Sequence, residues 1–236
     1  MAALASTTKS MKGVFPRMRK VCDHCGKPLK EIEVNLFGKM VKVTCWESCG
    51  CSESKLDGMY ITDRQKEYVR AGIPERYLGA ESGDDKHLSV MAGNSLYVQG
   101  DNGNGKTRYA CGIARKLVDA GTSVYFINSK HLISEIQGTY SGRPTDVLDR
   151  AYNCKVLVLD DLGKEQPTAY SLSTLYELID SRYSAMKPIV VTSNFSRGGL
   201  AERWASADLP TAEAIASRLC EGVETVVFEG GDRRLA

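Results

Sequence analysis

The chain has 236 residues, with 42% hydrophobic and 25% charged side chains and a formal net charge of +2. This length suits one compact domain with a small accessory module, and the composition excludes a collagen-like or wholly disordered chain. The small net charge excludes a protein that acts as a bulk polycation, and no apolar run approaches the roughly 18 residues that a membrane-spanning helix needs.

The first 20 residues form a basic arm, and a Cys-rich module follows over residues 21–56. The arm has five basic residues, no acidic residue and no hydrophobic signal segment, so we expect a cytoplasmic protein with reduced thiols. The module begins with a C-x-x-C pair, continues with a predicted hairpin over residues 31–43, and ends with three more cysteines. The candidate metal ligands are Cys22, Cys25, Cys45, Cys49 and Cys51. Because four thiolates complete a tetrahedral site, we predict that four of these five bind Zn²⁺. The isolated Cys111, Cys154 and Cys220 are expected to be buried.

Residues 57–92 are predicted to be a polar connector that leads into an α/β core over residues 93–236. In this core, short β-rich runs alternate with helical patterns. The predicted strands are 95–99, 123–127, 155–159, 188–192 and 225–228. The predicted helices are 105–120, one that begins near 130, 170–184 and two segments near 198–220. This alternation is typical of a parallel sheet with crossover helices.

Residues 100–107 have the sequence GDNGNGKT and match the phosphate-loop pattern G-x-x-x-x-G-K-T between a predicted strand and a predicted helix. The glycines let consecutive backbone N–H groups point at phosphate oxygens, and the helix N-terminus adds partial positive charge beneath them. Lys106 is expected to reach the β- and γ-phosphates, and the Thr107 hydroxyl to bind Mg²⁺. The predicted nucleotide-binding residues of this segment are Gly100, Asn102, Gly103, Asn104, Gly105, Lys106, Thr107 and Arg108.

Polar side chains follow two further apolar strands. Asp160 and Asp161 come after VLVL, and Asn194 follows IVVTS. Because the carboxyl ends of parallel strands meet at the edge that carries the phosphate loop, we expect Asp160 to bind Mg²⁺ and Asp161 to activate water. The Asn194 amide is placed to orient that water. The pattern therefore predicts hydrolysis as well as nucleotide binding, with Lys106 as a further catalytic residue.

Four motifs together resemble those of AAA+ ATPases of the DnaC/IstB type, which include bacterial and phage replicative-helicase loaders and transposition ATPases. They are AGIPERY at 71–77, the phosphate loop, LDDLG at 159–163 and TSN at 192–194. The resemblance covers about residues 57–236 and implies an ASCE-type P-loop αβα sandwich with a parallel sheet. It also implies that Asn194 senses the γ-phosphate. By the same resemblance, Arg218 is an arginine finger that completes the ATP site of a neighbouring subunit.

The resemblance implies further contacts. Ile73 and Tyr77 are candidates for the adenine pocket, with simple packing of the connector as the alternative. Arg234 is a candidate second sensor, in a C-terminal stretch that lacks the family's aromatic residue. Candidate contacts to single-stranded DNA, which combine cations with an aromatic ring near the family's DNA-facing helix, are Lys130, Tyr140 and Arg143. A solvated loop is the alternative interpretation of that segment.

The leading hypothesis is an ATP-dependent replication protein that loads a replicative hexameric helicase onto single-stranded DNA. It would bind the helicase through the Cys-rich module, assemble with its own copies through ATP-bridged interfaces, and need no membrane. Its expected cofactors are ATP, Mg²⁺ and Zn²⁺. The alternatives are an IstB-type transposition ATPase, which the cysteine cluster disfavours, and a small-molecule kinase, which needs no neighbour's arginine. A zinc-bearing adaptor that binds ATP without turnover is the remaining alternative.

Overall fold

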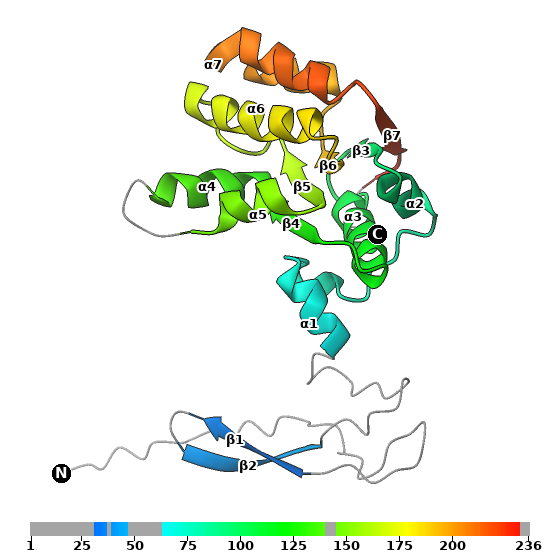
Figure 1. The fold of residues 1–236 in the computed structure, drawn as a ribbon, viewed down its shortest axis with the longest axis vertical. Coiled ribbons are helices and arrows are strands. Elements are labelled where there is room, and N and C mark those ends of the chain that lie inside the picture. Colours follow the sequence, from blue (N-terminus) through cyan, green and yellow to red (C-terminus); the bar gives the residue numbers. More distant parts are fainter. Residues whose placement is uncertain (1–30, 37–38, 47–62, 140–144, 232–236) are drawn as a thin grey trace, which may run out of the picture. The chain divides into compact units, whose positions relative to one another are not determined.

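The computed structural model describes residues 31–36, 39–46, 63–139 and 145–231 (Figure 1). The chain divides into two units, residues 1–61 and residues 62–236. Residues 63–91 of the predicted connector contain helices and belong to the second unit.

The first unit contains an antiparallel hairpin of β1 (Glu31–Leu36) and β2 (Lys39–Trp46). Apolar and polar residues alternate along β1 and over residues 41–45 of β2, which is the period of two that a strand requires. The hairpin predicted from the sequence is therefore confirmed. Cys45 lies in β2, whereas the other four candidate zinc ligands lie outside the described residues. In the part of the chain that the structure describes, no group of three His, Cys, Asp or Glu side chains is placed to hold a metal ion, so the zinc site stays a prediction.

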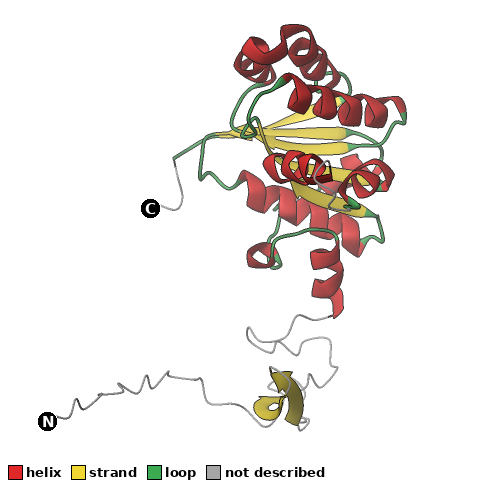
Figure 2. Ribbon diagram, turned by 90° about the vertical axis from the view of Figure 1, so that its left-hand side faces the viewer, coloured by secondary structure: helices red, strands yellow, loops and turns green. Residues whose placement is uncertain are grey.

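The second unit is built on a five-stranded parallel sheet in the order β4-β5-β6-β3-β7, with helices on both faces (Figure 2). The strands are β3 (Ser95–Gly100), β4 (Val124–Asn128), β5 (Val156–Leu162), β6 (Ile189–Ser193) and β7 (Val223–Phe228). The helices are α1 (Asp63–Arg70), the 3-10 helix η1 (Glu75–Tyr77), α2 (Lys86–Met91), α3 (Lys106–Asp119), α4 (Ser129–Thr139), α5 (Val147–Asn153), α6 (Ala169–Ser184) and α7 (Arg197–Arg218). This arrangement confirms the predicted α/β class with a parallel sheet.

Successive strand residues point into two buried clusters, one on each face of the sheet. Leu157 and Leu159 of β5 pack with side chains of α4, α5, α6 and α7. Val156 and Val158 of the same strand pack with side chains of α1, α2 and α3. Because both faces are covered, the central strands are continuous apolar runs, and polar residues are confined to their ends. The strand ends are therefore where chemistry can be placed.

Helix α7 contains the two helical segments predicted near 198–220, with a break at Asp208 (φ −167°, ψ 94°). Pro210 has no backbone N–H and cannot continue the helical hydrogen bonds. The Asp208 carboxylate accepts hydrogen bonds from the Thr211 N–H at 3.2 Å and the Thr211 hydroxyl at 2.7 Å. Asp208 therefore caps the second segment.

Two features of the core differ from expectation or were not expected. Cys111 and Cys154 are buried as predicted, but Cys220 is exposed, because it follows the end of α7 in the turn to β7. Arg182 on α6 is 1% exposed and was not predicted to be buried. Its guanidinium donates hydrogen bonds to the carbonyl oxygens of Ala151, Cys154, Lys155 and Pro188. Among the helices described, none has the length and hydropathy that a membrane span requires.

Candidate functional site

A cavity of about 930 Å³ lies along the carboxyl ends of four strands of the sheet. The phosphate loop contributes Asn102, Gly103, Gly105, Lys106, Thr107 and Arg108, and the ends of β5 and β6 contribute Asp160, Asp161, Lys164 and Asn194. The connector supplies Gly72, Pro74, Arg76 and Tyr77, and the segment from β4 to α5 supplies Tyr125, Phe126, Ile127, Asn128, His131 and Arg150. One cavity thus brings together the phosphate loop and both strand-end motifs.

The phosphate loop has a backbone that depends on its glycines. Gly103 and Gly105 have φ angles of 77° and 102°, which residues with a Cβ rarely adopt. A Cβ at Gly100 would lie 2.3 Å from the carbonyl oxygen of Phe228, so the loop packs directly against the end of β7. At the same place Asn104 Nδ2 donates a hydrogen bond to Phe228 O at 2.8 Å. These contacts fix the loop at the N-terminus of α3.

The Lys106 ammonium lies inside this loop and is 5% exposed. It donates hydrogen bonds to the carbonyl oxygens of Gly100 and Asp101, both at 2.7 Å. Burial lowers the pKa of Lys106. Because neutral carbonyls hold the ammonium, its charge is available to an anionic group that enters the cavity.

Asp160 is a buried carboxylate beside the loop, with 5% exposure. Its Oδ1 accepts hydrogen bonds from the Thr107 hydroxyl at 3.0 Å and the Thr192 hydroxyl at 2.7 Å. Burial raises its pKa, and these two hydroxyl donors oppose the shift. A hydroxyl and a carboxylate oxygen in contact are the kind of oxygen ligands that Mg²⁺ takes from a protein, so Thr107 and Asp160 fit that ion.

Asp161 faces the cavity from a distorted part of β5. Its φ is 59°, in the left-handed region, and the pairing of β5 with β6 is irregular between Leu159 and Leu162. Its Oδ1 lies 2.8 Å from the Lys164 ammonium, and its Oδ2 lies 3.4 Å from Asn128 Nδ2. The distortion turns the Asp161 side chain toward the cavity. Strained backbone of this kind is common at functional sites.

Asn194 lies next to the phosphate loop, where its Nδ2 donates to Asn102 Oδ1 at 2.8 Å. Its Oδ1 is shielded from solvent and has no hydrogen-bond partner among the described residues. A buried, unsatisfied acceptor at the cavity fits an additional donor such as a water molecule. The loop, the two aspartates and this amide together fit a magnesium–nucleotide complex.

The connector is attached to the edge of the sheet beside the cavity. Phe126 N donates to Ala71 O at 2.6 Å, and Gly72 has a φ of 89°. A Cβ on Gly72 would lie 2.1 Å from Phe126 O, so only glycine fits there. This attachment brings Tyr77 to the cavity, whereas the position of Ile73 agrees with the alternative, simple packing of the connector. Ile73 is 2% exposed, packs in the core and does not line the cavity.

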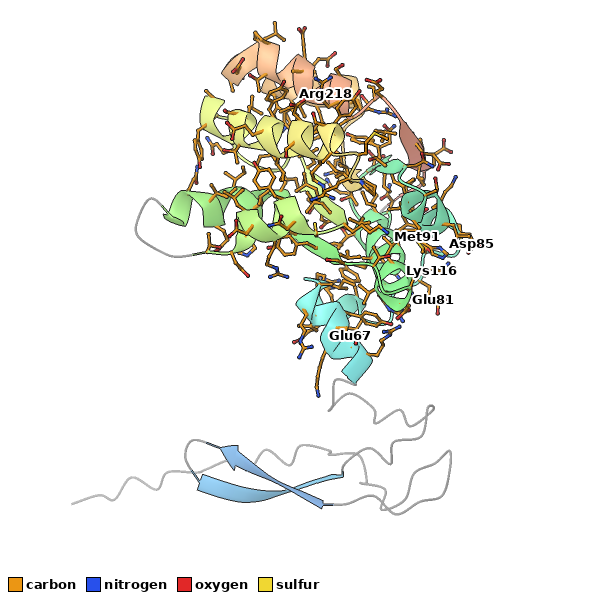
Figure 3. All side chains as sticks on the ribbon, in the orientation of Figure 1. Glu67, Glu81, Asp85, Met91, Lys116 and Arg218 are labelled. Carbon is orange, nitrogen blue, oxygen red and sulfur yellow. The ribbon has the colours of Figure 1, made fainter. Side chains whose placement is uncertain are left out.

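The remaining predicted residues lie elsewhere. Arg218 lies on α7 (Figure 3) and does not line the cavity. Its Nε is 2.7 Å from Asp180 Oδ1, and its guanidinium stacks on Tyr183, 4.6 Å from the ring centroid. Its role as an arginine finger stays a prediction. Lys130 is exposed on the first turn of α4 and does not line the cavity. Tyr140, Arg143 and Arg234 lie outside the described residues.

Sequence reasoning missed several residues of the cavity. Asn128 has the same signal as Asn194, a polar side chain that ends an apolar strand, and could have been found in that way. Arg150 carries no motif. Its guanidinium stacks 4.1 Å from the Tyr125 ring centroid and donates to Arg70 O at 2.6 Å. Only the packing of α5 against β4 and α1 brings it to the site.

The fold and the site define a P-loop nucleotide-binding protein of the AAA+ kind, with the phosphate-loop strand separated from the aspartate-bearing strand by one strand. The chain belongs to the family of IstB-like ATP binding proteins, whose sequence model matches residues 87–236.

Individual relatives fall into two groups. A Mycobacterium tuberculosis protein named as an ATP-binding protein in an insertion sequence is 34% identical over 104 residues, which are 44% of this chain and 41% of that protein. The replicative helicase loader DnaC of Escherichia coli is 26% identical over 125 residues, which are 51% of each chain. The chain thus spans about half the length of these curated relatives.

Solved structures agree in fold. The crystal structure of the DnaC helicase loader has a TM-score of 0.55 and 25% identity, and it covers 66% of this chain and 100% of its own. The crystal structure of DnaI has a TM-score of 0.57 and 23% identity, with 68% and 94% covered.

Proposed function

We propose that this protein is an ATPase that assembles with its own copies, binds a replicative helicase and loads it onto single-stranded DNA. The observation that carries the ATPase part is the convergence of Lys106, Thr107, Asp160 and Asp161 on one cavity with the phosphate loop. A nucleotide-binding adaptor needs the loop but has no use for a second, cavity-facing carboxylate. The strained backbone of Asp161 therefore favours turnover over binding alone.

Each residue has a defined task in this proposal. The loop N–H groups and Lys106 bind the phosphates, while Thr107 and Asp160 bind the ion. Bound Mg²⁺ supplies positive charge that neutralises the phosphate oxygens. Asp161 accepts a proton from the attacking water, which requires its carboxylate to exchange the Lys164 contact for that water. Asn194 orients the same water through its amide.

The helicase as partner is supported by relatives that are named replicative helicase loaders. A transposition ATPase is the second candidate, and it is supported by the relative in an insertion sequence and by the family description. The cysteine pattern of residues 22–51 favours the helicase loader, because transposition ATPases of this type are expected to lack such a cluster. We propose that four of these five cysteines bind Zn²⁺ and that the module binds the helicase.

Native mass spectrometry of the full chain with the replicative helicase hexamer of its own host, with and without ATP, tests the partner and the zinc together. We expect a nucleotide-sensitive complex with one zinc ion per chain. If the protein binds ATP but forms no complex with the helicase, the transposition candidate takes precedence. A mass without zinc would contradict the metal proposal alone.

The ATPase part is tested separately by steady-state hydrolysis of ATP. Asp161→Asn should abolish turnover and leave ATP binding intact, because the amide keeps the size of the side chain but accepts no proton. A wild-type protein that binds ATP with no turnover, alone or with DNA and helicase, would establish the adaptor instead.

A further inference from the structure

Glu165 is a buried carboxylate that the proposed chemistry does not use. It lies between β5 and α6 and is 1% exposed. Its Oε2 accepts hydrogen bonds from the Ser129 hydroxyl at 2.8 Å and the Gly163 N–H at 3.0 Å. Its Oε1 accepts one from the indole N–H of Trp204 at 3.0 Å. All three donors are neutral groups, so hydrogen bonds compensate for the burial of this charge.

The three donors connect the turn that follows Asp161 to two helices. Gly163 belongs to the turn itself, Ser129 is the first residue of α4, and Trp204 is a fully buried residue of α7. The Ser129 hydroxyl also lies 3.0 Å from the carbonyl oxygen of Asp161. Arg203 of α7 donates from Nε to Gly163 O. One carboxylate therefore joins the Asp161 turn to both α4 and α7.

A neutral side chain of the same size cannot make this set of contacts. A carboxylate has two acceptor oxygens, whereas the glutamine amide has one acceptor oxygen and an NH₂ group that only donates. In Glu165→Gln, at least one of the three donors would face another donor in a site without solvent. The position therefore requires two acceptor oxygens, which glutamate supplies and glutamine does not.

We propose that Glu165 is a positioning residue for ATP hydrolysis, which holds the Asp161 turn in its cavity-facing geometry and couples that turn to α7. This inference rests on the proposed ATPase function. Trp204 lies in the first segment of α7, before the break at Asp208, so the coupling is to that segment. Trp204 makes the contact between α7 and Glu165, so its indole N–H can report on the position of the Asp161 turn.

The first test is steady-state ATP hydrolysis by full-length Glu165→Gln. We expect kcat to fall about 10- to 100-fold while KM for ATP changes less than about 3-fold, because a small displacement of Asp161 affects the chemical step and leaves the phosphate loop in place. Tyr109→Phe is the matched control. It removes a partly buried hydrogen bond to a carboxylate, from Tyr109 to Asp84 at 2.7 Å, outside the cavity lining. It should leave both parameters unchanged.

Two weaker variants keep the test decisive if Glu165→Gln does not fold. Ser129→Ala and Trp204→Phe each remove one donor to Glu165, and each should lower kcat with little change in KM. Wild-type kcat in a folded Glu165→Gln, or in both weaker variants, would overturn the proposal.

The second test follows the indole N–H of Trp204 by NMR in a Trp46→Phe background, where Trp204 is the only one of the two tryptophans left. Its signal should shift when a non-hydrolysable ATP analogue binds, and Glu165→Gln should suppress that shift. A signal whose position does not change when the nucleotide binds would contradict the coupling.

Lys106→Ala distinguishes failure of the proposed function from failure of the role of Glu165. If Lys106→Ala hydrolyses ATP as fast as the wild type does, the proposed ATPase function fails. If the wild type depends on Lys106 but Glu165→Gln has the same kcat as the wild type, only the role of Glu165 is overturned.

Discussion

The Thr192 hydroxyl donates a hydrogen bond to Asp160 Oδ1 at 2.7 Å. Thr192 Oγ1 in turn accepts a hydrogen bond from the backbone N–H of Asp161 at 2.9 Å. Thr192 lies on β6, the strand between the phosphate-loop strand and the strand that carries both aspartates. Because a hydroxyl is donor and acceptor at once, this one side chain orients the Asp160 carboxylate and holds the strained backbone of Asp161.

Replacement of Thr192 by valine tests this relationship. The variant keeps the shape of the side chain and removes both hydrogen bonds, so the free energy of unfolding should fall by about 1–3 kcal/mol. The ATPase kcat should fall about 10-fold or more, because both carboxylates lose their orientation. Urea denaturation and steady-state kinetics measure the two effects. Thr174→Val is the control, since its hydroxyl donates a hydrogen bond to Tyr170 O within α6. A kcat equal for both variants would contradict the role of Thr192.

The sequence predicted the parts of the site that are contiguous in the chain. The phosphate loop, the Asp160–Asp161 pair and the strand-end Asn194 each follow from local pattern, because the carboxyl ends of parallel strands share one edge. Thr192 and Arg150 could not be found in this way. A threonine inside an apolar strand has the β propensity expected there, and its contact with Asp160 exists only once β5 and β6 pair.

The same limit applies to the connector and to the buried Arg182. Ile73 and Tyr77 are four residues apart in one motif, and only the docking of residues 71–72 on β4 decides which side chain faces the cavity. The α/β alternation was predicted with its five strands, since buried parallel strands are short apolar runs. The buried Arg182 follows no such rule, because its carbonyl partners come from α5 and from the residues just before β5 and β6, which meet only in the folded chain.

Gly72→Ala tests the attachment of the connector. An alanine there must adopt a φ of 89° and place a Cβ 2.1 Å from Phe126 O, so we expect a loss of about 2–4 kcal/mol in the free energy of unfolding. Gly79→Ala is the matched control, because a Cβ at that position meets no atom within 4 Å. Denaturant unfolding of both variants gives the difference. Equal stability of the two variants would show that the connector can move away from β4 without loss of stability.

Asp160→Asn tests the balance between stability and function. Burial raises the pKa of Asp160 from its ordinary 3.8, so the folded protein holds the proton more tightly than the unfolded chain does. Ionisation of this carboxyl therefore destabilises the fold as the pH rises from 3.8 through the folded-state pKa, and the penalty is fully present at neutral pH. Asparagine does not ionise, so the Asp160→Asn variant does not carry this cost.

We accordingly expect Asp160→Asn to be more stable than the wild type at pH 7, with a difference that shrinks as the pH falls through the raised folded-state pKa of Asp160 toward 3.8. ATP hydrolysis should be lost, because the amide is a poor ligand for Mg²⁺. Urea denaturation between pH 3.5 and 8, with magnesium absent, measures the first effect. A variant that is less stable than the wild type at pH 7 would mean that the hydrogen bonds from Thr107 and Thr192 depend on the charge.

Arg218→Ala tests assembly through shared sites. In the free subunit the Arg218 guanidinium pairs with Asp180 and stacks on Tyr183, outside the lining of its own cavity. If it acts on the nucleotide of a neighbour, its loss should lower kcat by about 10³- to 10⁵-fold and leave ATP affinity nearly unchanged. Arg64→Ala is the control, because Arg64 also pairs with carboxylates, those of Glu67 and Asp119, but lies on α1. Its activity should equal that of the wild type.

Mixing subunits distinguishes a role in the neighbour's site from a role within the same chain. Lys106→Ala lacks a working phosphate loop but keeps its arginine, and Arg218→Ala keeps the loop but lacks the arginine. Each is expected to be inactive alone. In a random equimolar assembly, about a quarter of the interfaces pair an intact loop with an intact arginine, so activity should return to roughly that fraction of the wild-type value. Two inactive proteins that stay inactive when mixed, while still assembling, would place the effect of Arg218 within its own subunit, through the contacts that it makes with Asp180 and Tyr183.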